Sequence, residues 1–134
     1  MFRLDKRKIF LLYQYYLLGG VNFSDALLLD LGEEKKKQER IAWFTSCLEK
    51  EKFLSERIGK KLKTGWEFSY LPPLERAVLV YAACELLSEK NGSLEKMIID
   101  QTINFSKVYL EKQKYKYINK ILDLLVQESK GAKK

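Results

Sequence analysis

The chain has 134 residues, a length that suits one domain with a single buried core. Hydrophobic residues make up 46% and charged residues 32%, and with only two prolines and seven glycines this composition favours long helices over a β-sandwich. The net charge of +7 favours an acidic partner, either nucleic acid or an anionic membrane surface. The alternative is a basic protein whose charge serves only its solubility.

No segment has the roughly 20 consecutive apolar residues that a membrane-spanning helix needs. Polar residues and glycines interrupt the uncharged stretch 9–24, and the N-terminus lacks the small-residue cleavage site of a signal peptide. We therefore expect a cytoplasmic protein. Cys47 and Cys84 lie within apolar helical patterns, so we expect buried, reduced thiols rather than a disulfide.

Apolar residues at helical spacing predict four helices in the first half of the chain. The first covers Asp5 to Leu18 and ends at Gly19-Gly20, where glycine readily takes the left-handed conformation. A short second helix carries Ala26 to Leu31. The third begins in the charge run at Glu33 and covers 33–48, and the fourth covers 53–62.

A break between helices is predicted at Thr64-Gly65, where the helical pattern weakens. The aromatic residues Trp66, Phe68 and Tyr70 follow, and we expect them to anchor this connection to the core. Pro72-Pro73 then marks the start of a fifth helix, because proline is tolerated in the first turn.

The fifth helix is apolar on every side from Ala77 to Cys84, a pattern typical of a central, buried helix. A sixth helix follows the turn at Asn91-Gly92. A seventh covers about Tyr115 to Gln127 and leaves 129–134 as a disordered polar tail. The sequence therefore predicts an all-α fold of about seven helices, forming one compact domain.

The residues give no support for an enzyme. There is no histidine, the usual general base, and the two isolated cysteines do not have the spacing of a metal site. No cofactor or metal is expected. Glu85 lies inside the apolar fifth helix, where a structural role is favoured over a catalytic one because a buried carboxylate needs hydrogen bonds.

A first basic cluster leads into the aromatic first helix, and it consists of Arg3, Lys6, Arg7 and Lys8. Cations bind phosphates, and aromatic rings can stack on unpaired bases. A solvated helix end explains the four charges equally well. Tyr13 falls on the packing stripe of this helix, so its spacing alone favours a core position.

A second basic cluster surrounds the turn between the last two helices. It consists of Lys107, Lys112, Lys114, Lys116 and Lys120, interleaved with Tyr109, Tyr115 and Tyr117. Lysine near a helix C-terminus already has a structural reason in the helix dipole, but the density of this cluster favours a phosphate-facing surface. The run 35–37 is flanked by glutamates and is interpreted as a solvated helix face.

Three of these segments, in order, resemble the C-terminal helices of the NusB family of transcription antitermination factors. L-E-R-A-V-L followed by E-L-L is similar to the family's fifth helix, and I-I-D-Q-T-I-N-F-S-K-V-Y is similar to its sixth. K-Y-I-N-K-I-L-D resembles the seventh, usually K-F-V-N-G-V-L-D, with Asn119, Leu122 and Asp123 at matching positions. The resemblance covers Leu71 to Leu125 and extends more weakly to L-L-Y-Q at Leu11 to Gln14.

The resemblance implies a non-enzymatic, all-helical protein that binds boxA-type single-stranded RNA together with the ribosomal protein NusE. Such complexes help RNA polymerase to read through terminators, notably in ribosomal RNA operons. For RNA contact the resemblance implies Arg3, Lys6, Arg7, Tyr13, Gln113, Lys116 and Tyr117. For NusE contact it implies Glu75, at the start of the fifth helix. The two basic clusters add Lys8, Lys107, Lys114 and Lys120 to the candidate RNA-binding residues.

The chain departs from the family pattern at three places. Its N-terminus is short and mixes acidic and apolar residues with the basic ones, Lys120 replaces a usual glycine, and Gln113 lies where an acidic residue is common. The last two changes make the second cluster more positive. The competing hypothesis is a non-catalytic interaction module, either a homodimer or a relative of the NusB-like domain of ribosomal RNA methyltransferases. No catalytic domain follows in this sequence to support the methyltransferase relative.

Overall fold

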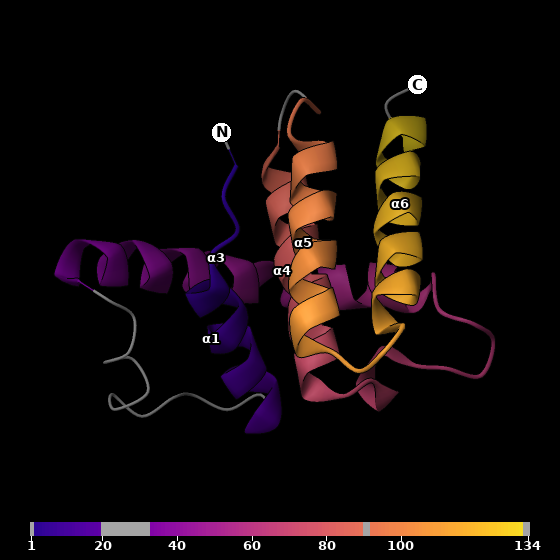
Figure 1. The fold of residues 1–134 in the computed structure, drawn as a ribbon, viewed down its shortest axis with the longest axis horizontal. Coiled ribbons are helices and arrows are strands. Elements are labelled where there is room, and N and C mark those ends of the chain that lie inside the picture. Colours follow the sequence, from indigo (N-terminus) through magenta and orange to yellow (C-terminus); the bar gives the residue numbers. More distant parts are fainter. Residues whose placement is uncertain (1, 20–32, 90–91, 133–134) are drawn as a thin grey trace.

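A computed structural model describes residues 2–19, 33–89 and 92–132, and the secondary structure in these ranges is entirely helical (Figure 1). The described α-helices are α1 (Lys6–Leu17), α3 (Glu34–Gly59), α4 (Pro73–Ser88), α5 (Glu95–Tyr109) and α6 (Lys114–Ala132), and the short 3-10 helix η2 covers Phe68–Tyr70. The prediction of an all-α fold is confirmed, although these ranges hold five α-helices rather than about seven. The second predicted helix, Ala26 to Leu31, lies outside the described residues.

The third and fourth predicted helices are one continuous helix, α3, so their separation was wrong. Residues 49–52, which lie between them, are alternating glutamates and lysines. Both residue types favour helix, and no glycine or proline interrupts them. A second correction concerns the C-terminus, where α6 continues to Ala132. Residues 129–132 are therefore helical rather than a disordered tail, since no proline stops the helix.

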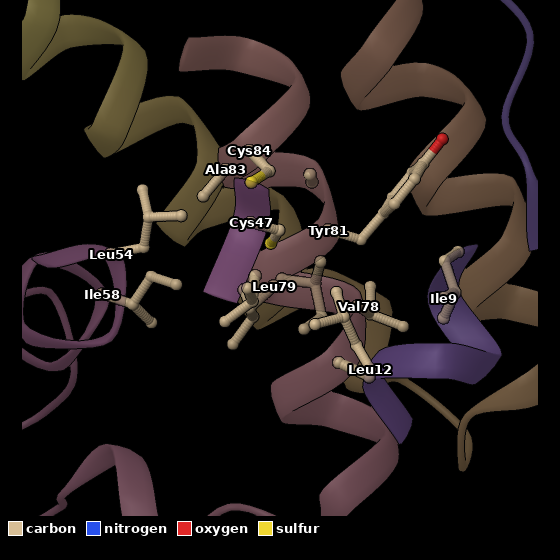
Figure 2. Close-up of a cluster of buried hydrophobic side chains, with 14 of the residues drawn as sticks. Ile9, Leu12, Cys47, Leu54, Ile58, Val78, Leu79, Tyr81, Ala83 and Cys84 are labelled. Carbon is tan, nitrogen blue, oxygen red and sulfur yellow. The ribbon is translucent and has the colours of Figure 1, made fainter. Parts of the chain in front are cut away.

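Helix α4 lies at the centre of the fold and packs against each of the other four described α-helices. Its residues from Ala77 to Cys84 are all buried, as the apolar pattern predicted. Figure 2 shows Val78 and Leu79 facing side chains of the neighbouring helices, among them Ile9 of α1 and Ile58 of α3. Because α4 is buried on every side, the positions of the surrounding helices are set by their packing against it.

The two cysteines meet inside this core, one from α3 and one from α4 (Figure 2). Both are free and buried, which agrees with the sequence-based expectation. The Cys47 thiol donates a hydrogen bond to Cys84, and this contact together with burial raises the pKa of Cys47 above its ordinary value. The pair therefore packs as two small apolar side chains.

The connection between α3 and α4 is anchored by fewer aromatic residues than predicted. Phe68 packs on the core with its ring centroid 5.8 Å from that of Tyr16, and Leu71 is buried. Trp66 and Tyr70 are 55% and 60% exposed, so the expectation that they anchor the connection was wrong. Residues three apart share a face of a 3-10 helix, so Phe68 and Leu71 point inward together and Tyr70 points away.

The central position of α4 predicts a large stability difference between two matched substitutions. Val78→Asp places an unpaired carboxylate at a fully buried position and should cost about 4 kcal/mol or more. Val108→Asp makes the same change at a position that is 74% exposed and should cost less than about 1 kcal/mol. Urea denaturation measures both, and equal stabilities of the two variants would show that α4 is not the core.

Candidate nucleic-acid interface

The side chain of Gln101 ties the N-terminal segment 2–5 to α5 through two hydrogen bonds. The Leu4 N–H donates to Gln101 Oε1 at 2.7 Å, and Gln101 Nε2 donates to the Phe2 carbonyl at 3.0 Å. These two bonds order the backbone on both sides of Arg3, whose side chain is exposed. The first basic cluster therefore starts from a fixed segment.

Asp5, the acidic residue among these cations, is engaged in internal contacts. Its carboxylate caps α1 by accepting the Arg7 N–H at 3.0 Å, and it accepts from Arg40 Nε at 2.8 Å. Its backbone N–H donates to the hydroxyl of Tyr81, at 3.0 Å, on the central helix. Asp5 therefore joins α1, α3 and α4, and its negative charge is balanced by the buried Arg40.

Three members of the first cluster, Arg3, Lys6 and Arg7, are exposed and line one hollow of about 560 Å³. Lys36 of α3 lines the same hollow, although sequence reasoning had assigned the run 35–37 to a solvated face. Lys36 reaches this hollow because α3 packs against α1. The spacing of residues along the chain does not predict that contact.

Two other candidates lie outside this hollow. The Lys8 ammonium lies over the Trp43 ring, 5.1 Å from its centroid, on the side of α3. Tyr13 is half-buried and packs against the core, in agreement with its place on the apolar stripe. The structure therefore separates Lys8 and Tyr13 from Arg3, Lys6 and Arg7.

The second cluster surrounds the turn into α6, where Gln113 has a φ of +71°. Few residues other than glycine adopt this left-handed conformation. The Gln113 side chain is exposed at the turn. Lys116 Nζ donates to Gln113 Oε1 at 3.4 Å. On the α5 side of the turn, the Lys107 ammonium lies 5.0 Å from the centroid of the Tyr115 ring. Lys114 Nζ lies 5.8 Å from the centroid of the Tyr117 ring, so two lysine–tyrosine pairs flank this turn.

Glu75, the residue implied for partner binding, lies beneath this second cluster and is only 4% exposed. Its Oε1 accepts a hydrogen bond from the Tyr117 hydroxyl and lies 3.8 Å from Lys114 Nζ. Burial and this carboxylate raise the pKa of Tyr117, which keeps the hydroxyl protonated and donating. Glu75 therefore positions two RNA-site candidates and does not present an open carboxylate.

A second hollow, of about 450 Å³, collects four of the candidate residues: Glu75, Lys114, Tyr117 and Lys120. Trp66 and Tyr70 line it as well, which sequence reasoning missed because it placed both rings in the core. Their neighbours Lys61 and Lys63, charged residues beside aromatic ones, were the signal that could have suggested an exposed site.

Other classes of site find no support in the ranges that the structure describes. They contain no group of three or more side chains that could hold a metal ion. None of their helices is long and apolar enough to cross a membrane. Glu85 accepts the Trp43 Nε1–H at 2.9 Å, a structural contact of the kind expected for it.

Comparison with known proteins identifies the family. The model of the NusB family matches residues 22–127, and the chain belongs to this family. Transcription antitermination protein NusB of Methylacidiphilum infernorum (isolate V4) is 26% identical over 123 residues, which are 88% of this chain and 84% of that protein. The protein of the same name from Sinorhizobium fredii (strain NBRC 101917 / NGR234) is 26% identical over 97 residues, 69% of this chain and 60% of its own length.

The fold agrees with this assignment. The solved structure of T. maritima NusB superimposes with a TM-score of 0.76 at 24% sequence identity. The match covers 95% of this chain and 94% of that one. At this identity the likeness defines the fold, and the family follows from the sequence match.

Because the Tyr117 hydroxyl donates to buried Glu75, removal of this hydroxyl should lower the stability of the protein. Tyr117→Phe keeps the ring but leaves a buried carboxylate without this donor, so unfolding should become easier by about 1–3 kcal/mol. Tyr70→Phe removes a hydroxyl from an exposed ring and should change stability by less than about 0.5 kcal/mol. Thermal denaturation compares the two, and a Tyr117→Phe protein as stable as the parent would contradict the role given to this bond.

Proposed function

We propose that this protein is a transcription antitermination factor that binds boxA-like single-stranded RNA together with the ribosomal protein NusE. It acts by assembly with the RNA polymerase antitermination complex in the cytoplasm and not by catalysis. Membership of the NusB family supports this proposal, as do the names of the relatives described above.

The observation that carries the proposal is the arrangement of cations around exposed or half-exposed aromatic rings at two places. Arg3, Lys6 and Arg7 project from an ordered segment, and the Lys6 ammonium lies 5.6 Å from the centroid of the Tyr109 ring. At the turn into α6, the ammonium groups of Lys107 and Lys114 lie over the rings of Tyr115 and Tyr117 in the same way. Phosphate-binding cations interleaved with rings that can stack on bases are the usual composition of single-strand sites.

The cationic and the aromatic side chains of the clusters can contribute to RNA binding in different ways. The exposed lysines and arginines neutralise phosphates without reading sequence, whereas the rings and the Gln113 side chain can contact bases. Glu75 supports the NusE-binding proposal only indirectly, because it is buried and acts through the position of Tyr117 and Lys114. We place the NusE surface around the start of α4 on the family resemblance.

The proposal predicts salt-dependent binding of single-stranded RNA. In fluorescence anisotropy titrations with a boxA-like oligonucleotide, affinity should fall with a log–log slope of about −0.7 for each phosphate that the protein neutralises. Lys116→Gln should reduce the magnitude of that slope by about 0.7. The matched control is Lys52→Gln, which removes an exposed lysine of α3 outside both clusters and should leave the slope unchanged.

The same titration tests the partner and the competing hypothesis. Addition of NusE should increase the affinity for the oligonucleotide, and duplex RNA of the same sequence should bind more weakly. Binding that is insensitive to salt would contradict a phosphate-binding surface, and equal binding of duplex and single strand would contradict the proposed preference for single-stranded RNA. Light scattering in parallel would reveal a homodimer, and a dimer that excludes RNA would favour the structural module.

A further inference from the structure

The hollow beside the first turns of α6 contains residues that belong to neither basic cluster. Its volume of about 450 Å³ lies within the range of about 300–1,000 Å³ that is common for ligand sites. The connection between α3 and α4 forms one side and runs past the start of α6 (Figure 1). Lys114, Tyr117 and Lys120 of α6 form the other side.

Trp66 and Tyr70 contribute two large exposed rings to this hollow from an ordered backbone. The Trp66 N–H donates to the Lys63 carbonyl at 3.0 Å, and the Tyr70 N–H donates to the Glu67 carbonyl at 2.9 Å. Phe68, between them, is packed on the core. Their exposure is therefore built into the connection, because the backbone around both rings is fixed.

Four lysines surround these rings: Lys61, Lys63, Lys114 and Lys120. Lys61 is paired with Glu128, and Lys114 lies near Glu75, whereas Lys63 and Lys120 are exposed to solvent. Lysine is depleted in the centres of protein–protein interfaces. Grooves for single-stranded nucleic acid combine cations that follow the backbone with aromatic rings on which bases stack. This composition favours RNA over a protein as the occupant.

We propose that this hollow holds a nucleotide of the single strand, between the segment bound at the turn into α6 and the start of α4, beside which NusE is proposed to dock. Its base stacks on Trp66 or Tyr70, and its phosphate lies near Lys63 and Lys120. The inference rests on the proposed RNA-binding function and extends the RNA path to the connection between α3 and α4. Tyr117 joins the two parts, since it belongs to the second cluster and lines the hollow.

Tryptophan fluorescence tests this contact directly. The chain has two tryptophans, so Trp43→Phe leaves Trp66 as the single reporter. Titration of this variant with a boxA-like single-stranded oligonucleotide should quench Trp66 emission, with the same midpoint as the anisotropy signal. The matched control places the reporter elsewhere: Phe53→Trp in a Trp43→Phe, Trp66→Phe background puts a tryptophan at an exposed position that lines a different hollow, and its emission should not change.

Measurements of RNA affinity provide a second test of this contact. Trp66→Ala should weaken binding by roughly 5- to 150-fold, which corresponds to about 1–3 kcal/mol for one stacked base. Because the ring is 55% exposed, this variant should melt like the parent protein. Phe53→Ala removes another exposed aromatic ring, on α3 and lining a different hollow, and should leave RNA affinity unchanged.

The outcomes separate this inference from the function on which it rests. If the parent protein binds no single-stranded RNA, both are overturned. If the parent protein binds RNA while Trp66 emission stays constant and Trp66→Ala binds equally well, the proposed function stands and this inference is wrong. If Trp66→Ala weakens binding of NusE but not of RNA, the hollow is a protein-docking site, and this inference is again overturned.

Discussion

The burial of α4 on every side is the constraint on which the rest of the structure depends. This helix contacts the other four described α-helices, and two of its polar side chains reach the two ends of the candidate interface. The Tyr81 hydroxyl accepts the Asp5 N–H next to the first basic cluster, and Glu75 accepts from Tyr117 in the second. These residues are six positions apart, or roughly 9 Å along the helix axis. One buried helix thus fixes both basic clusters relative to each other.

Two carboxylates that lie beside the clusters, those of Asp5 and Glu75, are used inside the protein. Asp5 balances the buried Arg40, and Glu75 balances Lys114 while it accepts the Tyr117 hydroxyl. Neither of these two carboxylates is therefore available to repel a phosphate, whereas Arg3, Lys6, Arg7 and Lys116 are exposed. In a chain of net charge +7, this arrangement concentrates the positive potential where the N-terminal segment and the turn into α6 lie.

The sequence predicted those parts of the fold that follow from local periodicity. Ala77 to Cys84 predicted a central helix because no side of it is polar, and Pro72-Pro73 marked the start of α4. Thr64-Gly65 lies in the break between α3 and α4, although α3 already ends at Gly59. The division of α3 was wrong because charged residues at 49–52 continue a helix as well as they end an apolar stripe. The places of Lys36 and of Trp66 depend on contacts between distant segments, which spacing along the chain does not encode. Glu75 was found by resemblance, but its burial beneath Tyr117 required the packing of α4 against α6.

The central claim is that two clusters, held by one helix, bind a single RNA strand together. Backbone amide hydrogen exchange with and without one boxA-like oligonucleotide tests it most directly, because each segment reports separately. The account predicts slower exchange in both segments 2–10 and 107–120 at the same RNA concentration, with the middle of α4 unchanged. Slower exchange in only one of the two segments, or in neither, would contradict a shared RNA surface.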